Sequence, residues 1–162
     1  MSLIHSTAQI SSMSDIEMSC RETTFSIGAY SKIDSFVKIK PVGGHGDIII
    51  GKKVYINSGC VIYSGNGVQI GDNVAIASNC TLAAVNHEYM NKEQLIIKQG
   101  HLPSKGGIII HEDVWIGANC VILDGSVIEK GCVIGAGSLV RGKCKQYSIY
   151  LGNPLKKVGE RT

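Results

Sequence analysis

The cysteines and histidines of this 162-residue sequence are its first candidates for a reactive or metal-binding site. Six cysteines are present, and three of them, Cys120, Cys132 and Cys144, follow one another at intervals of twelve residues. Metal binding, disulfide formation and packing would each explain recurring cysteines. The sequence has no C-x-x-C pair, and a step of twelve is not a zinc-ligand spacing. Packing is therefore the favoured explanation, and it requires a repeating structure.

Histidine suits the role of a general base, because the unperturbed pKa of imidazole, ~6.5, lies near working pH. His5 lies near the terminus, His45 lies in a glycine-rich segment, and His111 follows an inward-facing position. We expect these three rings to face solvent. His87 and His101 share one long polar segment, and His87 stands at its root, where geometry is best fixed. His87 is the first candidate base and His101 the second.

Most of the chain, including the segments that carry the cysteines, follows a six-residue repeat. A branched apolar residue recurs every six positions, and a small or β-branched residue usually follows it four positions later. The branched positions are Ile4, Ile10, Ile16; Ile27, Ile33, Ile39; Ile50, Ile56, Ile62; Ile70, Ile76, Leu82; and Ile110, Ile116, Ile122, Ile128, Ile134, Val140. All six cysteines, Cys20 included, fall on the small position.

A period of six fits neither a helix nor a long strand, but it fits a short strand followed by a tight corner. Three such units close a triangular coil of eighteen residues, and coils stack at the strand spacing of about 4.8 Å. We therefore predict an all-β parallel β-helix with branched side chains inside. The cysteines occupy crowded corners as reduced, inert, small apolar residues.

The repeat is interrupted at residues 43–47, 64–67 and 86–107. Loops on a rigid scaffold often carry function, and the last of these is long enough to have a task. We expect one domain over residues 1–162, with a protruding loop at about 86–107 and a C-terminal tail at about 146–162.

Composition narrows the classes of function. Apolar residues make up 44% of the chain, and the net charge is only +3, so the balance does not favour a nucleic-acid partner. No apolar run approaches the ~20 residues needed to cross a bilayer. The first residues lack the layout of a signal peptide, so we expect a cytoplasmic protein without a membrane span.

The hexads, the loop that opens with NHE, and the runs VWIGANCVIL, VIGAGSLV and GNPLKK resemble the hexapeptide-repeat acyltransferases. The resemblance is strongest to the maltose, galactoside and polysaccharide O-acetyltransferase branch. It implies a left-handed β-helix that assembles as a homotrimer, with acetyl-CoA bound between neighbouring copies as acyl donor. It also implies a small sugar-like acceptor and no metal.

The resemblance assigns roles to particular residues. It implies that His87 is the catalytic base, that Asn57 helps to polarise the reacting groups, and that Trp115 packs beside the pantetheine arm. Further contacts to CoA are implied for Gly117, Ala118, Ala136 and Lys156, with Lys157 and Arg161 nearby. The Thr-Lys pair frequent in the family is replaced here by Arg141 and Gly142, so the corresponding positive charge is expected at Arg141 or Lys143. Two features depart from galactoside-type enzymes: Gly65 replaces a carboxylate at the sugar site, and their N-terminal helical segment is missing.

The expected function is transfer of an acetyl group from acetyl-CoA to a hydroxyl of a sugar or glycan precursor. An N-acetyltransferase of an amino sugar, a xenobiotic acetyltransferase and a non-catalytic β-helix scaffold remain open. A zinc carbonic anhydrase on this fold would need histidines where Ala118 and Leu123 stand. A two-domain nucleotide-sugar acetyltransferase would need a further domain.

Overall fold

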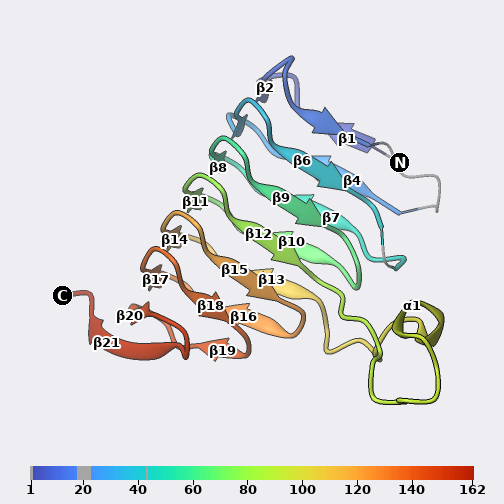
Figure 1. Ribbon diagram of the computed structural model, residues 1–162. Coiled ribbons are helices and arrows are strands. Elements are labelled where there is room, and N and C mark those ends of the chain that lie inside the picture. The colour runs from blue at the N-terminus through green and yellow to red at the C-terminus, as the bar shows by residue number, and fades with distance from the viewer. Residues whose placement is uncertain (1, 18–22, 43) are drawn as a thin grey trace.

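The computed structural model describes residues 2–17, 23–42 and 44–162 and shows a parallel β-helix (Figure 1). Each coil contributes one short strand to each of three sheets, here called A, B and C in chain order. All neighbouring strands are parallel except the last pair of sheet B. The predicted fold class, an all-β left-handed parallel β-helix of hexapeptide repeats with one long loop, is confirmed.

The three sheets are defined by their strands in stacking order. Sheet A holds β1 (Ser2–Ile4), β4 (Phe25–Ile27), β7 (Ile48–Ile50), β10 (Val68–Ile70), β13 (Ile108–Ile110), β16 (Ser126–Ile128) and β19 (Lys143–Cys144). Sheet B holds β2 (Gln9–Ile10), β5 (Lys32–Ile33), β8 (Tyr55–Ile56), β11 (Ala75–Ile76), β14 (Trp115–Ile116), β17 (Val133–Ile134), β20 (Ser148–Leu151) and β21 (Lys156–Glu160). Sheet C holds β3 (Asp15–Ile16), β6 (Lys38–Lys40), β9 (Val61–Tyr63), β12 (Thr81–Ala83), β15 (Val121–Leu123) and β18 (Leu139–Val140).

The core consists of three columns of branched side chains, one behind each sheet. Ile50 pairs with Ile70, and Ile70 with Ile110, so that the same side chain of the hexad points inward in every coil. These isoleucines are at most 2% exposed. Complete burial of such a side chain stabilises the folded state by about 1.5–3 kcal/mol. The repetition of this contribution fixes the register of the stack.

The corners of the coil differ in how much variation they tolerate. Four residues link sheet A to sheet B in every coil before the last, and four also link sheet B to sheet C. The corner where the chain passes from sheet C to sheet A, here the C–A corner, varies in length. All three interruptions seen in the sequence lie there: residues 41–47, 64–67 and the long loop of residues 84–107. The long loop contains α1 (Ile96–Gln99), the one helix among the described residues.

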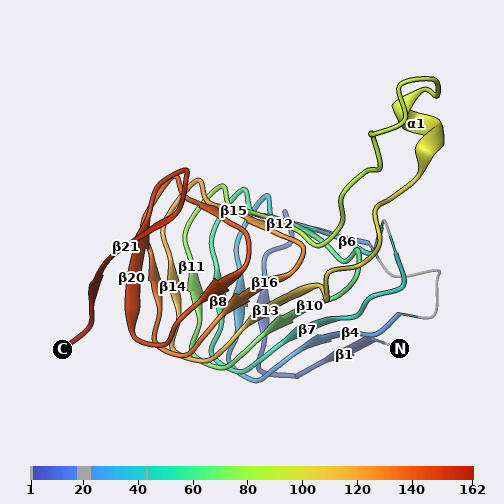
Figure 2. The ribbon, with the colours of Figure 1, turned by 90° about the horizontal axis from the view of Figure 1, so that it is seen from below.

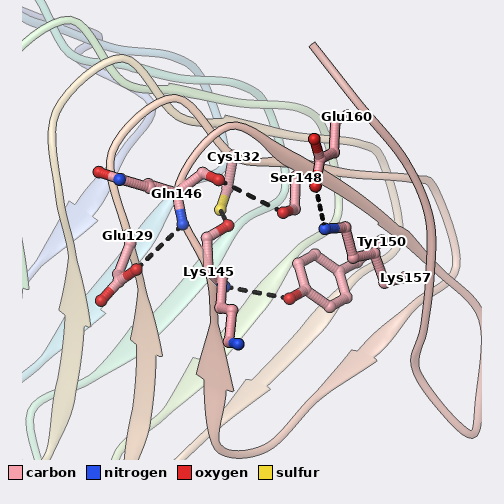
Figure 3. Close-up of polar contacts among 8 residues, drawn as sticks. All are labelled: Glu129, Cys132, Lys145, Gln146, Ser148, Tyr150, Lys157 and Glu160. Atoms are coloured by element: carbon pink, nitrogen blue, oxygen red, sulfur yellow. Dashed lines mark hydrogen bonds and ion pairs between the residues drawn. The ribbon is translucent and has the colours of Figure 1, made fainter.

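Residues 146–162, expected as a tail, contain β20 and β21. β20 is the last parallel strand of sheet B, and β21 is an antiparallel cap on its edge. β21 pairs with β20, so the final coil presents no free edge on this side. Polar contacts hold the turn beneath the cap (Figure 3). The Tyr150 hydroxyl accepts a hydrogen bond from the Lys145 amide at 3.0 Å, and the Gln146 amide donates to Glu129 at 3.0 Å.

The cysteines are buried and free, as predicted for the five that the structure describes. Cys60, Cys80, Cys120 and Cys132 occupy corner positions, but the prediction is wrong for Cys144. This residue pairs with Ile128 and takes an inward strand position in sheet A. The reason is that only four positions separate Val140 from Cys144, whereas six separate their partners Ile122 and Ile128 in the preceding coil, which shifts the hexad register. Cys20 lies outside the described residues.

The described thiols are expected to be inert in the folded protein. Burial raises the pKa of Cys144 to about 12 and also raises the pKa of Cys132. A hydrogen bond with Cys80 lowers the pKa of Cys60, yet the Cys60 side chain is fully buried. Ellman's reagent should therefore label a Cys20→Ser variant only on unfolding, whereas the unsubstituted chain has at most one fast thiol. Rapid labelling of two or more thiols in the native protein would contradict the packing role.

Candidate active site

The long loop leaves the β-helix through a short two-stranded neck. The Leu102 amide donates to the Asn86 carbonyl at 2.8 Å, and the Glu88 amide donates to the Gly100 carbonyl at 3.1 Å. His87 and His101 face each other across this ladder, with ring centroids 4.8 Å apart and planes inclined by 35°. Figure 2 shows the loop standing away from the stacked coils. The neck therefore fixes the backbone of the two candidate bases while both rings remain exposed.

His87 opens onto a cavity of about 270 Å³ at the C–A corner. Tyr89 and Leu102 of the loop form one wall, and Leu123, Asp124 and Arg141 of the next coils form the other. Arg141 is exposed and has no carboxylate partner among the described ion pairs, in contrast to Lys143, whose Nζ lies 2.7 Å from Glu129. The His87 imidazole and the Arg141 guanidinium thus share one cavity, which Lys105 also lines.

Asp124 is the residue at this corner that sequence reasoning missed. Its side chain is 5% exposed, and its two carboxylate oxygens accept three hydrogen bonds. The Gly107 amide donates to Oδ1 at 2.9 Å, the Lys105 amide donates to Oδ2 at 2.9 Å, and the Asn66 amide group donates to Oδ2 at 3.1 Å. Asp124 therefore ties the returning end of the loop to the insertion of the coil below. Asp124 could have been noticed in the sequence as a carboxylate within the otherwise apolar or small hexad run VILDGSVI.

The proposed CoA-contacting turns lie at a different corner, where the chain passes from sheet B to sheet C, here the B–C corner. The Gly117 amide donates to the Ile134 carbonyl at 2.7 Å, and the Gly137 amide donates to the Ala118 carbonyl at 2.8 Å. A Cβ on Gly117 would lie 2.6 Å from the Ala136 amide nitrogen, so only glycine permits this approach. Ala136 is exposed on the outside of the stacked turns.

Trp115 and Asn57 lie along this same edge. Trp115 is 54% exposed on the outer face of β14. Asn57 follows β8, and its amide group donates to the Ile76 carbonyl at 2.8 Å, which holds the side chain against the next coil. Within one chain the structure does not bring Asn57 to His87, because the B–C and C–A corners are different edges of the prism. It does bring Arg141 to His87, away from Ala118 and Ala136.

The basic residues at the C-terminus are not equivalent. Lys157 pairs with Glu160 (Figure 3), and Arg161 pairs with Asp113 at 2.8 Å. Lys156 is exposed on the cap, and no ion pair involves it in the part of the chain that the structure describes. Of the three cations, Lys156 is the one whose charge is left for a ligand.

Within residues 2–17, 23–42 and 44–162, no group of three or more histidine, cysteine and acidic side chains is arranged to hold a metal ion. In the same residues, no helix has the length and apolar character that a membrane span requires.

Comparison with known proteins agrees with this architecture. Residues 107–142 match the family "Bacterial transferase hexapeptide (six repeats)", and residues 47–84 match "Hexapeptide repeat of succinyl-transferase". The chain is 36% identical over 114 residues to the galactoside O-acetyltransferase of Escherichia coli, covering 70% of this chain and 54% of the relative. It is 28% identical over 137 residues to the putative lipopolysaccharide biosynthesis O-acetyl transferase WbbJ of the same organism, covering 82% and 66%. The chain thus spans less than two thirds of the length of these curated relatives.

Among solved structures, a variant of the Bacillus cereus N-acyltransferase AntD superposes with a TM-score of 0.82 at 26% identity. The match covers 99% of this chain and 84% of AntD, which was crystallised with dTDP-4-amino-4,6-dideoxyglucose and coenzyme A. Fold, corner geometry and sequence matches together define a hexapeptide-repeat β-helix of the transferase type. The resemblance to the hexapeptide-repeat acyltransferases that the sequence indicated is confirmed by these matches.

Replacing Asp124 should loosen the root of the loop. Asp124→Asn keeps the shape but places an amide N–H against a backbone N–H, which leaves a buried donor without an acceptor. We expect the free energy of unfolding in urea to fall by about 1–3 kcal/mol. Asp72→Asn is the matched control, because the exposed Asp72 carboxylate accepts a single backbone hydrogen bond, from Lys52 at 2.8 Å. Equal, small effects of the two substitutions would show that Asp124 does not anchor the loop.

Proposed function

We propose that this protein is an acetyl-CoA-dependent O-acetyltransferase that acts on a hydroxyl of a sugar or glycan precursor. The observation that carries the proposal is the position of His87, held by a hydrogen-bonded neck at the mouth of a cavity on a hexapeptide scaffold. The galactoside and lipopolysaccharide O-acetyltransferase relatives support an acceptor of this class. Because the match covers only part of both relatives, their activity is proposed for this chain.

In the proposed reaction His87 is a general base. The acceptor oxygen forms a bond to the acetyl carbon as its proton moves to a ring nitrogen of His87. The carbon–sulfur bond of the thioester then breaks, and the departing CoA sulfur takes the proton back from His87. The Arg141 cation is suited to stabilise the negative charge on the carbonyl oxygen. Atoms and charge balance without a covalent acetyl-enzyme.

The donor site is proposed along the B–C corner. The pantetheine arm lies over Trp115 and the turns at Ala118 and Ala136, where Gly117 allows close stacking. Lys156 on the C-terminal cap meets the CoA phosphates. The tryptophan supplies apolar area, and the free charge of Lys156 supplies attraction for an anion.

We further propose that the working unit is a homotrimer. The proposed donor residues and Asn57 lie on one edge of the prism, and His87 and Arg141 lie on another. A three-fold ring joins the B–C edge of one copy to the C–A edge of the next and forms three equivalent sites. The exposed Trp115 ring supports a site that is closed by a second chain or a ligand. Because the described cysteines are free thiols, as is usual in a reducing compartment, we place the enzyme in the cytoplasm.

N-acylation of an amino sugar is the second candidate, and the superposition on AntD favours it. The two functions differ only in the nucleophile of the acceptor. Treatment of the acetylated product with mild alkali separates them, since an acetyl ester is cleaved and an acetamide survives.

Turnover is tested by release of free CoA thiol across a panel of sugars, amino sugars and nucleotide sugars. With the best acceptor, His87→Ala should lower kcat by about 10²–10⁴-fold, because a general base acts in the transition state. The affinity for acetyl-CoA should change little, since the residues proposed to hold the donor are Trp115, Ala118 and Lys156 and not His87. His101→Ala is the control, as His101 faces His87 across the neck but does not line the cavity. Near-normal turnover of His87→Ala together with loss in His101→Ala would transfer the role to His101.

A shared site is tested by mixing two inactive variants. His87→Ala and Asn57→Ala trimers should each lose most activity. After random reassembly of a 1:1 mixture, a site that takes His87 from one copy and Asn57 from another regains both residues in about a quarter of cases. Activity should therefore return to about a quarter of the wild-type level. No recovery in verified mixed trimers would refute sharing, and a 17.3 kDa monomer in sedimentation would refute the trimer.

A further inference from the structure

The two ends of the β-helix are closed to different degrees (Figure 1). At the C-terminal end, β21 covers the last parallel strand of sheet B, and Tyr150 and Leu155 pack against the core. Val140 and Cys144, the last inward residues of sheets C and A, are at most 1% exposed. At the N-terminal end, β1, β2 and β3 are the outermost strands of their sheets, and each pairs on one side only within the described residues. The first coil is therefore the open end of the stack.

The inward side chains of the first coil lack the cover that later coils have. Ile4 is 45% exposed, whereas Ile27, its partner in the next coil, is 2% exposed. Ile10 and Ile16 are half-buried, and their partners in β5 and β6 are buried. The three columns of the core thus end in an apolar surface formed by Ile4, Ile10 and Ile16, here called the N-terminal face. Apolar surface of this kind favours association.

Backbone groups of the N-terminal face are also left without a partner strand. In the second coil the carbonyls of the hexad isoleucines accept hydrogen bonds from the first coil, and the Ile27 carbonyl accepts from the His5 amide at 3.0 Å. The equivalent carbonyls of Ile4, Ile10 and Ile16 therefore point away from the stack, and no described coil lies beyond them. A lipid surface is a poor occupant, because hydrocarbon offers these groups no donor. Extended strands are the partners that would satisfy them.

We propose that the N-terminal face binds the same face of a second copy, so that two β-helices meet end to end about a two-fold axis. The occupant must present three strand edges in the triangular arrangement of β1, β2 and β3, and another β-helix end does so. The C-terminal end of a copy is unsuitable, because β21 already occupies the edge of sheet B. A two-fold contact reverses the chain direction across the junction, so the facing strands are antiparallel and can form a regular ladder.

The charges around the N-terminal face permit contact with an identical surface. The corners of the first coil, residues 5–8 and 11–14, contain no carboxylate, ammonium or guanidinium group. The acidic residues at β3, Asp15 and Glu17, lie beside lysines of the next coil, and Glu17 forms an ion pair with Lys40. Hydroxyl side chains are frequent in both corners, and a hydroxyl can donate as well as accept a hydrogen bond. Two copies therefore meet without the like-charge repulsion that a strongly acidic or basic face would cause.

End-to-end contact doubles whatever ring the β-helices form. In the proposed homotrimer the axes of the β-helices are parallel, so three N-terminal faces lie side by side and engage a second ring at three points. The expected particle is then a hexamer of two rings. The loop with His87 and the proposed donor edge lie on the sides of the prism, so they stay accessible in the double ring.

The test is the mass of the 162-residue chain in light scattering and sedimentation. The wild type should have the mass of two rings, which is six chains if the ring is a trimer. Ile4→Glu and Ile4→Lys should each have the mass of one ring, because like charges then meet across the junction. Since Ile4 is already 45% exposed, either charge can reach water in the single ring. An equimolar mixture of the two variants should regain the double mass, because the opposed faces then carry opposite charges.

Val158→Glu is the matched control, since Val158 is 60% exposed on the cap at the opposite end, and this variant should keep the double mass. Hydrogen exchange of the wild type needs no variant. Amides of residues 2–17 should exchange as slowly as those of residues 25–40, because the junction protects an end that would otherwise fray. A wild type with the mass of one ring, fast exchange of residues 2–17, or a double mass that Ile4→Glu keeps and Val158→Glu abolishes would each overturn the proposal.

Discussion

The register between stacked coils is the constraint on which the rest of this structure depends. Each strand of the stacked coils, β1 to β20, has two to four residues and is too short to be stable alone. It persists because neighbouring coils pair with it and cover its inward side chain. A residue added within a strand would turn every later side chain to the wrong face. Additions are therefore confined to corners, and in this protein they gather at one corner.

Because the insertions share one corner, the long loop of residues 84–107 has a fixed root. Insertions that leave the same corner of successive coils stack on one another by backbone contacts. The Gly46 amide donates to the Gly65 carbonyl at 3.0 Å, and the Asn66 amide donates to the Ala84 carbonyl at 2.9 Å. A Cβ on Gly107 would lie 2.5 Å from the Gly67 carbonyl oxygen, so glycine is required where the loop returns. The buried carboxylate of Asp124 completes this stack of insertions. The stack fixes the root of the loop, and the root fixes the position of His87.

Sequence alone predicted the columns of isoleucine and the site of the long loop, because the inward direction of each hexad is a local property. It could not predict features that depend on which coils stack. Asp124 bonds to Asn66, 58 positions away, and this partnership exists only after the long loop is excluded from the register. Cys144 follows the hexad count in sequence, but its distance from the inward Val140 is two residues shorter than the repeat, which moves it into sheet A. α1 has no buried side chain, so its sequence has no apolar periodicity from which a helix could be predicted. The roles expected of Asn57 and Lys156 remain predictions.

The open end of the β-helix links stability to the proposed donor site. A parallel stack ends in unpaired strands that would accept another chain, and β21 prevents this on sheet B by folding back antiparallel on β20. The cap is fastened to the body by Arg161, which donates to Asp113 and to the Gly131 carbonyl at 3.1 Å. Lys157 is neutralised by Glu160 within the cap. The same fastening leaves Lys156 as the unpaired cation, at the end of the edge that carries Trp115 and Ala136. The cap that closes the fold thereby also places Lys156 where it could contact the phosphates of the proposed CoA.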